Sequence, residues 1–61
     1  MVPPYRAYIV KPNGRAELAE EFLCADDDEA RLRFGVLAEG AAKAELWQNG
    51  RLVELIDRKT R

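Results

Sequence analysis

The fold of this chain is decided by residues 26–40, which read DDDEARLRFGVLAEG. Asp26 followed three residues later by Glu29 is typical of a capping box, in which side chains accept hydrogen bonds from free backbone amides at a helix start. The acidic run also places negative charge in the first turn, where the helix dipole favours it. Gly40 suits the position just past a helix end, because glycine adopts the left-handed conformation without strain. The stretch therefore predicts one helix over residues 26–39.

One face of this helix is apolar. At about 100° per residue, the residues that share it are Ala30, Phe34, Leu37, Ala38 and Ala41. We expect this face to pack on a sheet. Leu32 and Val36 fall opposite Phe34, and we interpret them as scattered surface hydrophobes, which are common in folded proteins.

After the helix, Asn49-Gly50 lies between two runs of alternating polar and apolar residues. Asn-Gly in this setting is the strongest short-range signal of a β-hairpin with a two-residue loop. The expected cross-strand pairs are Gln48 with Arg51, Trp47 with Leu52, Leu46 with Val53, Glu45 with Glu54, and Ala44 with Leu55. An inward face would then carry Ala44, Leu46, Val53 and Leu55. The opposite face would carry Trp47, Leu52 and Ile56.

Before the helix, Pro12-Asn13-Gly14 predicts a hairpin with a three-residue loop, because Pro12 presets φ and Gly14 can take a left-handed conformation. The loop would pair Tyr8 with Leu18 and Arg6 with Glu20. We favour as core the face that carries Tyr8, Val10, Leu18, Phe22 and Cys24. The alternative face carries Tyr5, Ala7, Ile9, Ala19 and Leu23. A bulge near Glu20-Glu21 could exchange the two faces along the second strand.

The predicted fold class is α+β, with the element order ββαββ in a single domain of residues 1–61. A right-handed crossover that skips the first strand gives a four-stranded antiparallel sheet of order 2-1-3-4, with the helix on one face and the other face open. Residues 1–4 form an N-terminal extension. Residues 57–61 form a basic tail that we expect to fray, since it carries Arg58, Lys59 and Arg61.

Composition excludes several classes of site. The chain has one cysteine and no histidine, so it cannot form an internal disulfide, and one thiol cannot build a zinc site. A net charge of −1 gives no general attraction to nucleic acid or to an anionic membrane. The apolar stretches are far shorter than a membrane span, and the first residues lack the features of a signal peptide. We expect a cytoplasmic protein with no membrane association.

Three features could suggest chemistry, and each has a simpler interpretation. The acidic run at residues 26–29 lacks the alternating ligands of a calcium loop, and helix capping accounts for it. Glu45 and Glu54, facing each other on an open sheet, lack the desolvated cleft that a carboxylate pair needs for catalysis. Cys24 has no histidine to activate it and is expected to be a buried hydrophobe. We predict no catalytic, metal or cofactor site and no enzymatic activity.

The functional hypothesis rests on the apolar residues left on the open face. We predict an interface at Trp47, Leu52 and Ile56, because large exposed apolar patches are unusual in monomers. A homodimer through this face would add burial to a small core, and an unknown protein partner is a further option. The leading function is a non-enzymatic interaction or regulatory module. The alternative is an accessory nucleic-acid binder using Arg31, Arg33, Arg58, Lys59 and Arg61, with only weak, salt-sensitive attraction from the tail.

Five short stretches are similar to one group of proteins. They are residues 5–10 (YRAYIV), Asn13-Gly14, Phe22 with residues 24–30 (CADDDEA), residues 44–47 (AELW) and residues 50–53 (GRLV). Together they resemble short uncharacterised alphaproteobacterial proteins of ββαββ type. The resemblance covers most of the chain but consists of turn, cap and core residues. It implies no activity and no functional residue.

Overall fold

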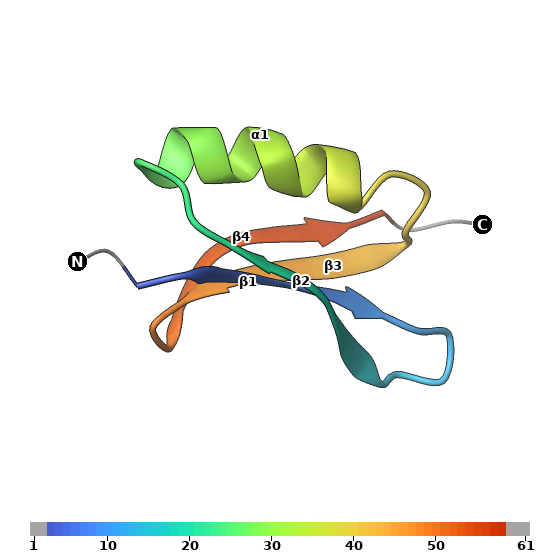
Figure 1. Cartoon of the computed structure of the whole chain (residues 1–61). Coiled ribbons are helices and arrows are strands. Elements are labelled where there is room, and N and C mark those ends of the chain that lie inside the picture. The colour runs from blue at the N-terminus through green and yellow to red at the C-terminus, as the bar shows by residue number, and fades with distance from the viewer. Residues whose placement is uncertain (1–2, 59–61) are drawn as a thin grey trace.

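The computed structural model describes residues 3–58. Its elements, in chain order, are β1 (Tyr5–Val10), β2 (Ala16–Phe22), α1 (Asp27–Leu37), β3 (Lys43–Gln48) and β4 (Arg51–Asp57). The strands form one antiparallel sheet of order β2-β1-β3-β4. Figure 1 shows α1 lying across one face of this sheet, with the opposite face uncovered. The predicted ββαββ architecture and strand order are confirmed.

The start of α1 is fixed by reciprocal capping. The Asp26 carboxylate accepts a 2.9 Å hydrogen bond from the Glu29 amide, and the Glu29 carboxylate accepts a 3.0 Å bond from the Ala25 amide. The helix ends at Leu37, two residues before the predicted end. The chain then turns, and Gly40 adopts a φ of 82°, which glycine tolerates better than any other residue.

The first hairpin has the predicted loop but a different register beyond its middle. Tyr8 lies opposite Leu18 as expected, whereas Arg6 pairs with Glu21 instead of Glu20. The shift arises because Ala19 is an extra residue in β2, one position before the Glu20-Glu21 site of the alternative with a bulge. The predicted Arg6–Glu20 pair is therefore wrong.

The bulge at Ala19 also decides which faces are buried. Tyr5 and Ala7 point into the core on β1, so the choice of Tyr8, Val10 and Leu18 as core residues is wrong. Phe22 is buried as predicted, because the bulge brings it to the side of the sheet that Tyr5 occupies. The rings of Tyr5 and Phe22 stack with their centroids 5.9 Å apart.

The second hairpin also contains one extra residue. Asn49 and Gly50 both have positive φ, as the predicted two-residue turn requires, and Trp47 lies opposite Leu52. The register then shifts at Val53, so the actual pairs are Leu46 with Glu54, Glu45 with Leu55, and Ala44 with Ile56. The three predicted pairs beyond Trp47–Leu52 are wrong, including Glu45 opposite Glu54.

The core lies between α1 and the sheet. Its buried members are Tyr5, Ala7, Phe22, Cys24, Ala30, Phe34, Ala38, Ala44 and Leu46, with Ile9, Leu37, Val53 and Ile56 packed against them. Phe34 is fully buried at its centre. Each large apolar side chain buried in this way stabilises the fold by about 1.5–3 kcal/mol. Leu32 and Val36 are exposed on the outer side of α1, as predicted.

The chain beyond β4 is held at Arg58. Its amide donates a 2.7 Å hydrogen bond to the carbonyl of Ala42. Its guanidinium donates to the carbonyls of Ala38 at 3.2 Å and Ala41 at 2.8 Å, near the C-terminal end of α1. Fraying from residue 57 is therefore wrong for Asp57, which lies in β4, and for Arg58. Lys59 and Arg61 lie outside the described residues.

Within residues 3–58, no helix has the length and apolar character that a membrane span requires.

Candidate functional site

The face of the sheet away from α1, called here the open face, carries three rows of side chains that cross all four strands. Ile9 and the buried residues of β1 and β3 point toward α1, so their neighbours in each strand point away from it. In the order β2, β1, β3, β4, the rows are Glu21-Arg6-Trp47-Leu52, Leu18-Tyr8-Glu45-Leu55 and Ala16-Val10-Lys43-Asp57.

Apolar side chains occupy much of this open face. Leu18, Leu52 and Leu55 are 53%, 46% and 47% exposed, although each is large enough to belong in a core. Tyr8 and Trp47 lie between them, half-buried. Exposed apolar side chains gathered on one face in this way mark interaction sites more often than ordinary surface.

Two of the three predicted interface residues lie on the open face. Trp47 and Leu52 are opposite each other there, as expected. Ile56 does not join them, because the bulge at Val53 turns it toward α1, where it packs against the core. Leu55 takes the outward position instead. The sequence carries no clear signal for this exchange, since the turn residues predict an uninterrupted ladder.

The charged groups of the open face are held in place by neighbours. Arg6 donates a 2.9 Å hydrogen bond to Glu21, which raises the pKa of the guanidinium. The indole Nε1 of Trp47 donates a 3.0 Å bond to the Glu45 carboxylate. A carboxylate has room for more donors than one, so Glu45 can accept a further bond from a partner.

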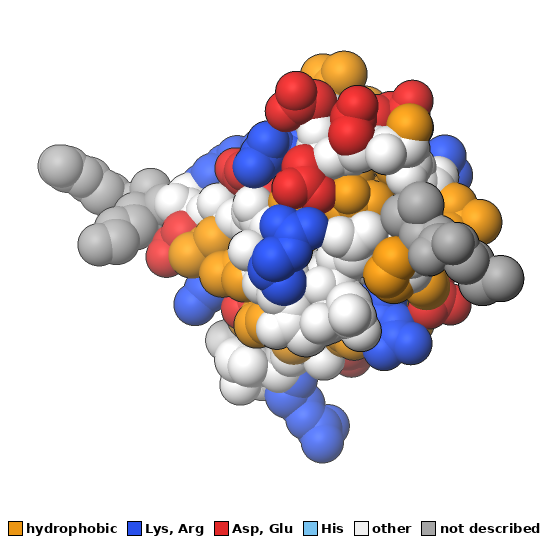
Figure 2. Space-filling view, turned by 90° about the vertical axis from the view of Figure 1, so that its left-hand side faces the viewer, with side chains coloured by type: hydrophobic (Ala, Val, Ile, Leu, Met, Phe, Trp, Pro, Cys, Tyr) orange, Lys and Arg blue, Asp and Glu red, His pale blue; other side chains and the backbone are white. Residues whose placement is uncertain are grey.

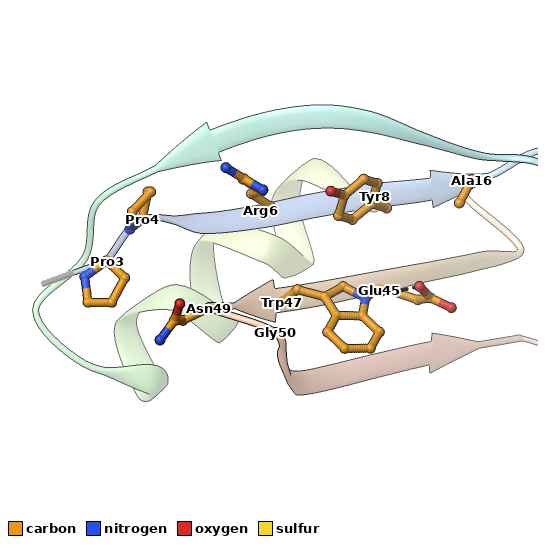
Figure 3. A pocket seen from close by; sticks show the side chains of 9 residues that line it. All are labelled: Pro3, Pro4, Arg6, Tyr8, Ala16, Glu45, Trp47, Asn49 and Gly50. Carbon is orange, nitrogen blue, oxygen red and sulfur yellow. Dashed lines mark hydrogen bonds between the residues drawn. The ribbon is translucent and has the colours of Figure 1, made fainter.

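A groove of about 470 Å³ lies on this face above β1 and β3, between the side chains that the two strands project. Arg6 and Tyr8 form one wall and Glu45 and Trp47 the other, while Pro3, Pro4, Ala16, Asn49 and Gly50 complete the lining. Figure 3 shows the four wall residues projecting from neighbouring strands on the same side of the sheet. The groove combines aromatic surface with one charge of each sign, which suits it to receive side chains.

The acidic residues 26, 28 and 29 stabilise α1. Asp26 and Glu29 cap α1, and Asp28 accepts a 3.0 Å hydrogen bond from Arg31. Among residues 3–58, no group of three or more potential metal ligands is gathered.

Asp27 is the centre of a network that the sequence analysis missed. It accepts a 2.7 Å hydrogen bond from the Tyr5 hydroxyl and two 3.2 Å bonds from the Arg51 guanidinium. Arg51 and then Tyr5 lower the pKa of the Asp27 carboxyl, and the bond to Asp27 raises the pKa of Tyr5. Figure 2 shows acidic and basic side chains side by side at this end of the molecule. No sequence pattern joins these residues, which are more than twenty positions apart.

The other candidate reactive groups are also engaged. Cys24 is buried, and burial, followed by the effect of the neighbouring Glu29 carboxylate, raises the pKa of its thiol, which disfavours the reactive thiolate. Glu54 accepts a 3.1 Å hydrogen bond from Arg31 of the helix. Glu45 lies opposite Leu55, so the two carboxylates do not form a pair.

The helix arginines proposed for nucleic-acid contact face acidic partners. Arg33 donates a 3.1 Å hydrogen bond to Glu20, and its guanidinium lies 5.0 Å from the centre of the Phe22 ring. Arg31 bonds both Asp28 and Glu54, and Arg58 bonds carbonyls at the end of α1. Each of these guanidinium groups therefore already has a hydrogen-bond partner in the same chain.

Comparison of the chain with protein-family models, with curated proteins and with solved structures finds no match in any of the three.

Proposed function

We propose that this protein is a small non-enzymatic interaction module that binds protein through the open face. The observation that carries the proposal is the set of three leucines on that face, Leu18, Leu52 and Leu55, each about half exposed, with Leu52 directly opposite Trp47. Water contact at these side chains costs free energy that a covering partner would recover, at about 25 cal/mol per Å² of apolar surface.

Protein is favoured over nucleic acid by charge. The three described arginines of the alternative hypothesis are bonded to acidic side chains or to helix carbonyls. Phosphate binding would have to displace these contacts. The net charge of −1 supplies no compensating long-range attraction.

Among possible protein partners, we favour a second copy of the same chain. A 60-residue domain buries only about 60% of its unfolded surface. This chain has one cysteine, so no internal disulfide can reinforce its small core. Twofold pairing would bury the same patch on both subunits. From the sequence we also propose a cytoplasmic location and kinship with short alphaproteobacterial proteins of this architecture.

The proposal is tested by photo-crosslinking in cells of the native host. A photoreactive benzoylphenylalanine replaces Leu52 on the open face, and a matched variant carries it at Leu32, which is 76% exposed on the helix. We expect protein adducts from position 52, to a second copy or to another protein, and few from position 32. Equal labelling at both positions, or labelling at position 32 alone, would contradict a role for the open face.

A further inference from the structure

The open face can meet a second copy of itself in two aligned arrangements. In the aligned class of sheet packing, facing sheets keep their strands within about 30° of each other. A twofold axis lying between the sheets can therefore run nearly parallel to the strands or nearly perpendicular to them. The two arrangements bring different side chains together, and the three rows of the open face allow a choice between them.

An axis parallel to the strands, between β1 and β3, sets β1 against β3 of the partner and β2 against β4 of the partner. Each row then meets the same row of the other copy. In the middle row, Tyr8 faces the partner's Glu45 and Leu18 faces the partner's Leu55. In the first row, Arg6 faces the partner's Trp47.

Each of these contacts is chemically favourable. The Tyr8 hydroxyl can donate to the partner's Glu45, whose carboxylate already accepts from its own Trp47 and has further lone pairs. A guanidinium over an indole ring is the best of the cation–π pairs, so Arg6 suits the partner's Trp47. Leu18 and the partner's Leu55 cover each other's exposed surface. No two like charges oppose each other in any row.

The perpendicular axis gives a poorer match. It places the middle row on itself, so that Glu45 would oppose the partner's Glu45 at the centre of the interface. Two carboxylates buried against each other lose hydration without gaining an attractive partner.

We propose that two copies of this chain pair through their open faces about a twofold axis that runs parallel to the strands between β1 and β3. The proposal rests on the proposed function and adds the arrangement: each copy supplies Tyr8 and Arg6 to the other's Glu45 and Trp47, and the groove between β1 and β3 is filled by these side chains.

The size of the face indicates a reversible dimer. Four strands about 4.8 Å apart, each about six residues long at about 3.3 Å per residue, present a flat area of roughly 400 Å². Specific interfaces commonly bury about 800 Å² per partner. Association therefore has to be followed from low micromolar to millimolar concentration, by sedimentation or by light scattering.

Crosslinking between single cysteines tests the arrangement. In a Cys24→Ala background, one protein carries Leu18→Cys and a second carries Leu55→Cys. A short bismaleimide is suitable because facing sheets lie about 10 Å apart. We expect a crosslinked dimer only when the two proteins are mixed, since position 18 faces position 55 of the other copy. Leu32→Cys in the same background is the control, and the bismaleimide should not crosslink it.

A charge variant gives an independent measurement. Glu45→Gln replaces the charged acceptor of Tyr8, so we expect it to weaken the dimer about tenfold, the equivalent of 1.4 kcal/mol. The perpendicular axis predicts the opposite, because the variant would remove a repulsion. Glu39→Gln makes the same charge change in the exposed turn that follows α1 and should leave the affinity unchanged.

The outcomes separate this inference from the proposed function. Self-crosslinking of either single-cysteine protein, or tighter association of Glu45→Gln, would overturn the parallel axis. A wild-type protein that remains monomeric up to millimolar concentration would overturn the dimer altogether. Photo-crosslinking of another protein at position 52 would then still support the open face as an interaction surface.

Discussion

The hydroxyl of Tyr5 donates a 2.7 Å hydrogen bond to the carboxylate of Asp27, which joins the first residue of β1 to the first residue of α1. Arg51, at the start of β4, binds the same carboxylate. Three elements that are distant in sequence thus converge on one side chain at the edge of the core.

This network predicts a pH dependence of stability. The folded pKa of Asp27 lies below its ordinary value of 3.8. The unfolded chain therefore binds a proton more readily, and the contribution of Asp27 is present above about pH 4 and is lost as pH falls through the folded pKa. We expect Asp27→Asn to be less stable than wild type at pH 7 and to approach it below pH 4 in thermal melts. Asp28→Asn, whose side chain is almost fully exposed, is the control. A constant difference across this range would contradict the assignment.

The N-terminal cap of α1 should be measurable on its own. Asp26→Ala removes the acceptor of the Glu29 amide, and loss of such a cap costs about 1 kcal/mol. Asp28→Ala removes only an exposed ion pair with Arg31 and is expected to change the free energy of unfolding by well under about 1 kcal/mol. Urea titrations of the two variants compare these effects. Equal losses would show that charge in the first turn matters more than the capping hydrogen bond.

Arg58 should stabilise the fold from the far end of the helix. Its guanidinium bonds the carbonyls of Ala38 and Ala41, and hydrogen bonds involving a charged group contribute about 1.5–3 kcal/mol, less when exposed to water. We expect Arg58→Ala to lower the unfolding free energy by about 1 kcal/mol. Lys11→Ala, which removes an exposed contact of 3.7 Å to Glu17, is the matched loss of a cation and should be nearly neutral. A neutral Arg58→Ala would mean that the carbonyls are satisfied equally well by water.

Sequence patterns predicted the turns and the helix cap because each is encoded within a few residues, and the strand order followed from the right-handed crossover between the two hairpins. Asn49 and Gly50 take the positive φ values that their turn demands, and Asp26 caps the helix through a partner three positions away. The bulges at Ala19 and Val53 follow instead from contacts between distant residues. Tyr5 stacks on Phe22, and Ile56 packs on the core, and each arrangement requires one extra residue in a strand. The open face was therefore foreseen in outline, with Ile56 in the place that Leu55 occupies.

The bulge at Ala19 gives a deletion experiment. Deleting Ala19 removes a residue that has no cross-strand partner, so the pairs on both sides and their faces are retained. Deleting Glu21 together with Ala19 instead moves Phe22 to the opposite face, since a one-residue slip inverts every side chain beyond it. We expect the first variant to fold, with some loss of stability, and the second to lose cooperative unfolding. Folding of both deletions with equal stability would contradict the role given to the bulge.

Leu52 distinguishes charge matching from simple loss of apolar surface at the dimer interface. About the proposed axis, Leu52 faces the partner's Glu21. Leu52→Glu then opposes two carboxylates, whereas Leu52→Lys opposes a carboxylate with an ammonium group, although both remove the same side chain. We expect Leu52→Glu to abolish the dimer and Leu52→Lys to retain much of it, with the difference shrinking in high salt.

Leu32→Glu, on the exposed face of α1, should dimerise like wild type. Sedimentation velocity at matched concentrations measures all three. Equal dissociation by the two Leu52 variants would leave the apolar patch as an interface and remove the argument for this orientation of the two copies.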